Sequence, residues 1–337
     1  MKYIFSQANY SRIICPIALI LFTHVINGQE ITMVGEEFPY SMESYTYKII
    51  DNHEIQADVY RLPGEELRPG IIWIHGGALI FGSREWLSSD QMKMYLKAGY
   101  TVISIDYRLA PETKLAGIVE DLEDAYSWVR SVGPKQLNID PERIAIIGHS
   151  AGGFLSLMAG FRLKPSPKAL VSFYGYGDIT GSWYTQPDSF YNQYPTISRE
   201  QALEFIGSSI ISNPPPGQNW PEGRAKFYLY CRQQGIWPSE VCGHDPLNEN
   251  DWFSDYEPVQ NVTSKYPPTI LLHGEKDTDV PFEQSIKMAE LLNQDNVPHE
   301  LIKNTEWGHV FDAAGKEDQL VQEAFNKVLE FLGRHVK

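Results

Sequence analysis

The sequence predicts an α/β fold built on a mostly parallel, doubly wound sheet flanked by helices. Three observations lead to this prediction. Short apolar runs alternate with segments of helical periodicity, several runs end in glycine-rich or acidic loops, and the 337-residue chain is 42% hydrophobic. Strands that alternate with helices form right-handed crossovers, and such a sheet carries its functional site at the carboxyl ends of its strands.

Eight strands are expected from the apolar and β-branched runs. The last six runs are short and almost wholly apolar, which is typical of parallel strands buried on both faces. In chain order the predicted strands are residues 45–50, 55–60, 71–75, 101–106, 144–148, 170–174, 269–273 and 299–303.

Helices are indicated between these strands by apolar residues that recur every three or four positions. Residues at this spacing share one face, so each helix is expected to pack an apolar stripe against the sheet. One stripe consists of Val119, Leu122, Ala125, Tyr126 and Val129, and another consists of Leu320, Val321, Ala324, Phe325, Val328 and Leu332.

The fifth predicted strand leads into the sequence Gly148-His149-Ser150-Ala151-Gly152. This G-x-S-x-G pattern is typical of a sharp strand-to-helix turn that exposes a nucleophilic serine. Backbone strain at such a turn costs roughly 1–3 kcal/mol and requires small neighbours, which Gly148 and Gly152 supply. The pattern therefore points to Ser150 as a nucleophile at a helix N-terminus, where a developing negative charge is stabilised.

The third predicted strand also ends in glycines, at His75-Gly76-Gly77-Ala78. In acyl transfer the substrate carbonyl oxygen gains negative charge, and each backbone N–H aimed at that oxygen lowers the barrier by roughly 3 kcal/mol. Gly76 and Gly77 are predicted to contribute two such N–H groups, and Ala151 a third. A glycine-rich turn without a chemical role is the alternative for this segment.

The seventh predicted strand opens into an acidic loop that contains Asp277 and Asp279, and His309 follows 32 residues after Asp277. The order Ser150, Asp277, His309 is the order of nucleophile, acid and base in one class of serine hydrolases. His309 is expected to carry the serine proton to the leaving group, and Asp277 to hold the imidazole tautomer. Asp279 is the competing candidate for the acid, and His299 is a weaker candidate for the base.

These segments together resemble the hormone-sensitive-lipase-like branch of the α/β-hydrolases, which comprises acetyl esterases, carboxylesterases and lipases. The resemblance runs from about residue 71 to the C-terminus. Its motifs are His75-Gly76-Gly77-Ala78, Asp106-Tyr107-Arg108-Leu109-Ala110-Pro111-Glu112, Gly148-His149-Ser150-Ala151-Gly152-Gly153 and the loops of Asp277 and His309. It implies an α/β-hydrolase fold and cleavage of carboxylic esters with short acyl chains, through an acyl-enzyme and without a cofactor or metal.

Two positions depart from the pattern of that branch. Ala78 stands where the branch usually has a third glycine, and His149 stands where it usually has an acidic residue. Other α/β-hydrolases that cleave peptides or amides also carry H-G-G and G-x-S-x-G, so an exported serine peptidase or amidase is the alternative enzyme. A binding protein on a hydrolase scaffold is the alternative from another class, although all three triad residues are present here.

Three further residues near the motifs are expected to support the site. The segment 106–112 is predicted to form a turn in which Arg108 makes an ion pair. His75 and His149 have no proton to move in this scheme, and we expect them to be structural or to face the substrate.

The stretch 178–257 interrupts the alternation of strands and helices. It is rich in proline and aromatic residues, and Pro214, Pro215 and Pro216 exclude a continuous helix through its middle. We expect a cap-like insertion over the serine, with most aromatic side chains packed between cap and sheet. We predict no individual binding residue among these aromatic residues, which include Trp183, Tyr184, Tyr191, Trp220, Tyr230 and Trp237.

Residues 1–28 resemble a signal peptide, which leaves a catalytic domain of residues 29–337. Lys2 and Arg12 precede the apolar run 13–22, which is far shorter than the roughly 20 residues that span a bilayer. A secreted or periplasmic enzyme without stable membrane insertion is therefore predicted, with an uncleaved anchor as the alternative. In an oxidising compartment Cys231 and Cys242 are either a disulfide or two buried thiols.

The composition limits the partners of the protein. A formal net charge of −15 repels nucleic acids and anionic membrane surfaces, so neither is expected as a partner. Cys231, Cys242 and His244 contain no C-x-x-C pair, so no metal site is expected. The expected partner is a small-molecule ester.

Overall fold

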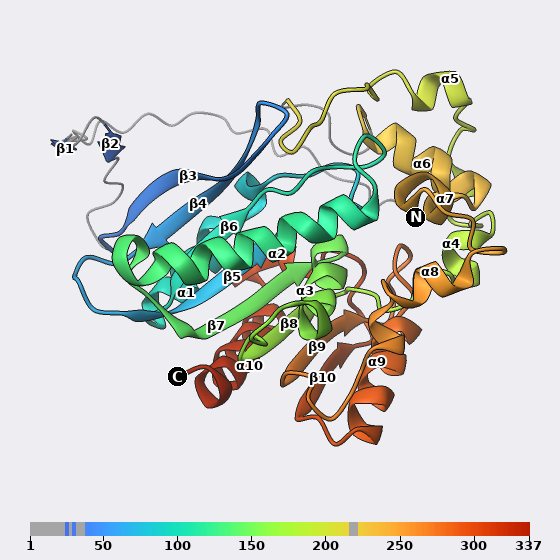
Figure 1. Ribbon diagram of the computed structural model, residues 1–337. Coiled ribbons are helices and arrows are strands. Elements are labelled where there is room, and N and C mark those ends of the chain that lie inside the picture. The colour runs from blue at the N-terminus through green and yellow to red at the C-terminus, as the bar shows by residue number, and fades with distance from the viewer. Residues whose placement is uncertain (1–23, 27–28, 32–37, 216–221) are drawn as a thin grey trace, which may run out of the picture.

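A computed structural model describes residues 24–26, 29–31, 38–215 and 222–337 (Figure 1). Within these residues, eight strands form one sheet, and β1 (His24–Ile26) and β2 (Gln29–Ile31) pair separately as an antiparallel ribbon. Of the predicted signal peptide, residues 24–26 are described and the rest lies outside the described residues. The strands of the sheet are β3 (Ser41–Ile50), β4 (His53–Arg61), β5 (Arg68–Ile74), β6 (Thr101–Ile105), β7 (Ile139–His149), β8 (Ala169–Phe173), β9 (Thr269–Gly274) and β10 (His299–Asn304).

The sheet has the strand order β10-β9-β8-β7-β5-β6-β4-β3. The six strands from β5 to β10 run parallel to one another, and β4 pairs antiparallel with both β6 and β3. The predicted fold class is confirmed, and each predicted strand has its counterpart. The largest shift is at β7, which starts at Ile139 rather than at residue 144 because Ile139 pairs with Arg68 across a register irregularity.

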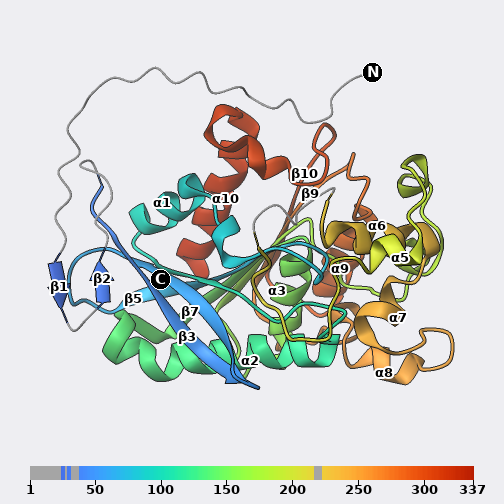
Figure 2. The same ribbon diagram turned by 90° about the horizontal axis from the view of Figure 1, so that it is seen from above.

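Helices cover both faces of the sheet, as Figure 2 shows. In β5 the side chains of Ile72 and Ile74 belong to the core beneath α2 and α3, while Ile71 and Trp73 belong to the core beneath α1 and α10. This division follows from the two-residue period of a strand. The covering helices are α1 (Ser89–Lys97), α2 (Leu115–Val132), α3 (Ala151–Arg162), α9 (Glu283–Gln294) and α10 (Gln319–His335).

The two predicted apolar stripes lie in α2 and α10. Every predicted residue of the α2 stripe is buried. In α10 the prediction is wrong at Leu320, which lies in the first turn with 45% of its surface exposed, and Phe331 is an additional buried member. The stripe is therefore shorter at its start than the sequence indicates.

A helical insertion separates β8 from β9 and gathers at one end of the sheet (Figure 1). Its helices are α4 (Ser182–Thr185), α5 (Arg199–Ala202), α6 (Ala225–Gln234), α7 (Trp237–Cys242) and α8 (Asn250–Ser254). Two side chains tie it to the loops that follow β5 and β6. Trp237 Nε1 donates to the carbonyl of Ala78 at 3.1 Å, and Arg224, with 1% of its side chain exposed, pairs with Glu112 at 2.6 Å.

The cysteines of the insertion are two buried thiols in this structure, Cys231 in α6 and Cys242 in α7. Burial raises the pKa of both thiols well above the usual range, so both remain protonated. In the described part of the chain, no helix combines the length and apolar character needed to cross a membrane.

Candidate active site

Ser150 lies at the turn between β7 and α3 in strained backbone. Its φ of 54° and ψ of −117° are outside the regions that non-glycine residues usually occupy. The flanking glycines are required sterically, because a Cβ on Gly148 would lie 1.8 Å from the carbonyl oxygen of Gly152, and one on Gly152 would lie 2.2 Å from that of Ile74. The turn therefore holds the serine side chain out at the carboxyl end of the sheet.

The glycine loop after β5 lies directly against this turn. A Cβ on Gly76 would lie 3.2 Å from the Cβ of Ser150, and Gly77 has a φ of 101° with the carbonyl of Phe81 beside it. Ala151 is the first residue of α3, so its N–H has no partner within the helix. The three predicted N–H groups thus belong to two backbone segments that meet at Ser150.

Ala78 shows what the departure from a third glycine does to this loop. It has a φ of 55° and Leu79 has a φ of 64°, so two consecutive side-chain-bearing residues are left-handed. Such residues cost on the order of 1–3 kcal/mol each and need support from their surroundings. That support includes the bond from Trp237 to the carbonyl of Ala78.

His309 joins the serine to an acidic loop. Its Nε2 lies 3.1 Å from Ser150 Oγ, and its Nδ1 lies 2.7 Å from Asp277 Oδ2. The ring packs edge-on against Tyr174, with 4.7 Å between ring centroids. The structure therefore brings Ser150, His309 and Asp277 together in one hydrogen-bonded chain.

Asp277 is fixed by its own loop. Its Oδ1 accepts from the backbone N–H groups of Asp279 at 2.8 Å and Val280 at 2.9 Å, and its side chain has no exposed surface. Burial opposes its ionisation, but the charge of His309 and hydrogen bonds from His273 and His309 hold the pKa of Asp277 well below its usual range. Asp277 is therefore an ionised acceptor on the Nδ1 side of the ring.

Asp279, the competing acid, lies on the other side of the ring. Its Oδ2 is 3.2 Å from His309 Nε2, the same nitrogen that faces Ser150. Its Oδ1 accepts from Tyr191 at 2.7 Å, Tyr228 at 2.5 Å and Arg232 at 2.9 Å, all from the insertion. Of the two aspartates, Asp277 has the position of an orienting acid.

The charges around the imidazole favour its protonated form. Burial lowers the pKa of His309, but the carboxylates of Asp277 and Asp279 outweigh it, so the pKa of His309 is raised. The imidazolium that forms when a base takes the serine proton is stabilised by the same carboxylates.

His149, the second departure from the family pattern, pairs with an acid elsewhere in the chain. Its Nε2 lies 3.2 Å from Asp312 Oδ2, which also accepts from Gln91 at 2.6 Å. Tyr174 donates to the other oxygen of Asp312 at 2.5 Å. Sequence reasoning missed Asp312, although its place three residues after His309 was a usable signal. This cluster ties the serine turn to the histidine loop.

The remaining sequence candidates take structural positions. His75 is fully buried, stacks on Tyr107 at 4.2 Å, and has a pKa lowered to about 4 by burial, so it is neutral. The predicted ion pair of Arg108 is confirmed, with Asp121 at 2.8 Å. His299 lies at the start of β10 and donates to or accepts from no triad residue; its Nδ1 contacts the carbonyl of Val297.

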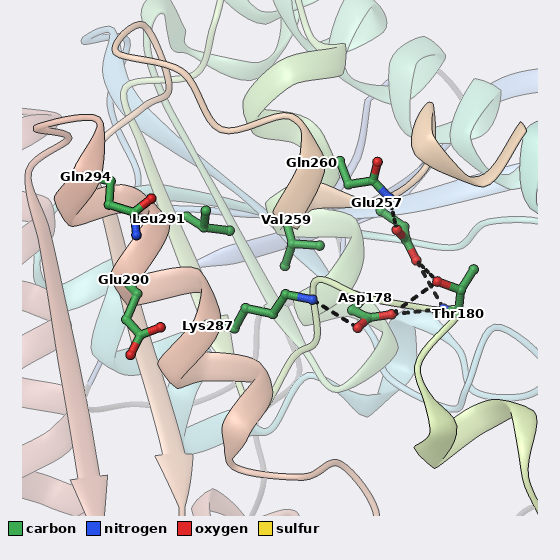
Figure 3. Close-up of a pocket in the computed structure, with 9 residues that line it drawn as sticks. All are labelled: Asp178, Thr180, Glu257, Val259, Gln260, Lys287, Glu290, Leu291 and Gln294. Atoms are coloured by element: carbon green, nitrogen blue, oxygen red, sulfur yellow. Dashed lines mark hydrogen bonds and ion pairs between the residues drawn. The ribbon is translucent and has the colours of Figure 1, made fainter. Parts of the chain in front are cut away.

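A cavity of about 400 Å³ lies between the insertion and α9, away from the triad (Figure 3). Its polar side chains bind one another: Lys287 pairs with Asp178 at 3.1 Å, and Thr180 donates to Glu257 at 2.7 Å. Among the described residues, no group of three or more His, Cys, Asp or Glu side chains is arranged to hold a metal ion.

Two family models divide the chain between them. One, described as α/β hydrolase fold, matches residues 71–221, and the other, the prolyl oligopeptidase family, matches residues 228–337. Both halves and the observed sheet agree on one fold family. The chain has the α/β-hydrolase fold. The first match covers the H-G-G and G-x-S-x-G segments, and the resemblance to the hormone-sensitive-lipase-like branch is confirmed.

Curated relatives of this α/β-hydrolase include fungal enzymes of much greater length. The chain is 29% identical over 330 residues to the non-reducing polyketide synthase adrD of Penicillium rubens, a match that covers 84% of the chain and 13% of the synthase. The chain spans between about an eighth and a sixth of the length of such relatives.

Solved structures share the fold of this α/β-hydrolase. An α/β-hydrolase superfamily protein from Enterococcus faecalis aligns with a TM-score of 0.67 and 22% identity, over 87% of the chain and 98% of that protein. Esterase 2 of Thermogutta terrifontis, phosphoramylated by tabun, aligns with a TM-score of 0.62 and 22% identity, over 87% and 94%. At these identities the likeness concerns the fold.

Proposed function

We propose that this α/β-hydrolase is a serine hydrolase that cleaves carboxylic esters, with Ser150 as nucleophile, His309 as base and Asp277 as orienting acid. The observation that carries the proposal is the hydrogen-bonded chain from Asp277 through both ring nitrogens of His309 to Ser150 Oγ. Two findings support it: the strained turn at Ser150 and the glycine loop that lies against it.

The reaction follows from this geometry in two stages. Ser150 Oγ attacks the ester carbonyl carbon while His309 Nε2 takes the hydroxyl proton, and the resulting imidazolium gives that proton to the departing alcohol. Water then attacks the acyl-enzyme, again with His309 as base, and releases the carboxylic acid and free serine. The N–H groups of Gly76, Gly77 and Ala151 would hold the oxyanion in both stages.

A serine peptidase or amidase is the second candidate, and one finding favours it. The half of the chain that carries Asp277 and His309 matches the prolyl oligopeptidase family. The same triad cleaves either bond, since the difference is protonation of a departing amine instead of an alcohol. We place the ester first because the segments around Ser150 and the glycine loop resemble the esterase branch.

The setting of the enzyme is part of the proposal. We propose an exported enzyme, secreted or periplasmic, that acts on a small ester with a short acyl chain and needs no cofactor. The N-terminal pattern of residues 1–28 supports export.

The proposal is tested by hydrolysis of p-nitrophenyl acetate, butyrate and decanoate, beside a peptidyl p-nitroanilide. We expect turnover of the short esters, and a loss on the order of 10⁴-fold or more in kcat for Ser150→Ala. Ser127→Ala, at an exposed position of α2, is the matched control and should retain full activity. If folded wild-type protein cleaves only the anilide, the protein is a peptidase and not an esterase. If it cleaves neither the esters nor the anilide, both proposed activities are overturned.

A further inference from the structure

Asp279 is a second carboxylate at the reacting end of His309. Its Oδ2 lies 3.2 Å from His309 Nε2. Its side chain keeps 18% of its surface exposed, whereas the side chain of Asp277 keeps none. One oxygen of Asp279 is therefore held by side chains of the insertion, and the other lies beside the catalytic nitrogen.

The position of the leaving group follows from the chemistry of the triad. His309 Nε2 must deliver its proton to the departing atom, so that atom lies within hydrogen-bonding distance of Nε2. Asp279 Oδ2 occupies another position around the same nitrogen. The first few atoms of the leaving group consequently lie close to this carboxylate oxygen.

The insertion prevents Asp279 from turning away. Its Oδ1 accepts three hydrogen bonds, from the hydroxyls of Tyr191 and Tyr228 and from Arg232. Arg232 has 1% of its side chain exposed and also pairs with Asp188 at 2.5 Å. The guanidinium is thus shared between two carboxylates and is shielded from the substrate by the residue it holds.

The fixed charges that face His309 are mostly negative. Asp277 and Asp279 come from the loop after β9, and Asp312 comes from the segment after His309, where Tyr174 and His149 bind it. Arg232 is the cation contributed by the insertion. A cationic group near Nε2 is therefore stabilised by this field, and an anionic group is repelled.

We propose that Asp279 is a specificity-determining residue that selects esters whose alcohol carries an ammonium or another hydrogen-bond donor close to the scissile bond, and rejects anionic alcohols. The proposal rests on the proposed esterase function of the same site. Asp279 Oδ2 accepts the hydrogen bond of the donor, while His309 Nε2 transfers its proton to the ester oxygen.

The test compares three butyrate esters of similar size on the full-length protein: 2-(dimethylamino)ethyl, which is an ammonium at neutral pH, 3-methylbutyl, which is its uncharged counterpart, and 2-carboxyethyl. Release of acid is followed in a pH-stat, and each kcat/KM is divided by the rate of alkaline hydrolysis of that ester. We expect the corrected values to fall in the order cation, neutral, anion, with about tenfold or more between the extremes, as for a partly buried charge pair.

Asp279→Asn should reduce the ratio between cation and anion to within about threefold, since the amide keeps the shape and removes the charge. Asp251→Asn, which removes an exposed carboxylate of α8, is the matched control for net charge and should keep the wild-type ratio. Thermal melting of both variants establishes that they are folded, and the wild-type series stands on its own if Asp279→Asn does not fold.

Equal corrected rates for the cationic and anionic esters in the wild type would overturn the role of Asp279 and leave the esterase intact. A wild-type preference that persists in folded Asp279→Asn would also overturn it. If none of the three esters is cleaved and the p-nitrophenyl esters are not cleaved either, the proposed function fails first and the inference fails with it.

Discussion

The two sides of the His309 ring are built in different ways. On the Nδ1 side, Asp277 is buried and is held by backbone N–H groups of its own loop. On the Nε2 side, Asp279 is partly exposed and is held by side chains of the insertion, chiefly Arg232 and Tyr228. The two aspartates are two residues apart in one loop, yet one depends on local backbone and the other on a distant segment.

The two aspartates are therefore suited to different tasks, one that needs a fixed environment and one that can vary with the insertion. A carboxylate that fixes an imidazole tautomer needs a rigid, dry environment, which a short loop after a buried strand supplies. A carboxylate that faces the leaving group needs exposure, and its position can change with the insertion while the triad is unaffected. In the proposed enzyme, the insertion shapes specificity around a site whose chemistry is set by the sheet.

The largest effect is expected from replacing the carboxylate on the Nδ1 side of His309. Asp277→Asn should lower kcat by about 10⁴-fold, because the amide cannot accept from Nδ1–H and stabilises the wrong tautomer. Stopped-flow or steady-state kinetics of p-nitrophenyl butyrate hydrolysis measure the loss in kcat. Asp279→Asn is the comparison, and a greater loss in that variant than in Asp277→Asn would reverse the assignment of the two acids.

The next effect concerns the anchor of the insertion. Glu112→Gln should lower the free energy of unfolding by about 3–5 kcal/mol, because it leaves the buried guanidinium of Arg224 without its charged partner. Urea denaturation measures the change. Glu120→Gln is the matched control, since Glu120 is 62% exposed at 3.4 Å from Arg108, and it should change stability by less than about 1 kcal/mol. Equal effects in the two variants would contradict the anchoring role.

A smaller effect appears in the pH dependence. A general base must be neutral, and the pKa of His309 is raised by Asp277 and Asp279 against the effect of burial, so activity should fall already as the pH drops through a midpoint above about 6.5. Asp279→Asn removes one cause of the raised pKa and should move this midpoint of kcat/KM to lower pH. A midpoint that stays or rises would show that Asp279 does not act on His309.

The smallest expected effect is a shift of the same pH midpoint in the opposite direction. Tyr228→Phe removes a hydroxyl that donates to Asp279 at 2.5 Å. The negative charge of Asp279 is then less compensated by the insertion and acts more strongly on His309. The same midpoint should rise, by less than about half a pH unit. A midpoint that falls in Tyr228→Phe would contradict the view that the insertion moderates this carboxylate.

The sheet and the triad order were predictable from sequence because their signals are local. Buried parallel strands are continuous apolar runs, and a strained serine turn needs glycines at fixed spacing. The same local signals gave a wrong prediction at Leu320, because the periodic spacing of apolar residues begins before the buried part of α10. They were also silent on the support of Ala78 by Trp237, 159 residues further along the chain.

Local sequence patterns were sufficient to predict the fold class, the position of Ser150 at a strand-to-helix turn, and the acidic loop and histidine that follow it in order. The folded chain was needed to see which aspartate faces which nitrogen of His309. It was also needed to see that His149 pairs with Asp312 and that Arg232 holds Asp279. The physical reason is that periodicity and turn chemistry act between neighbours along the chain. Side-chain contacts between distant segments arise from packing in space and leave no repeating pattern in the sequence.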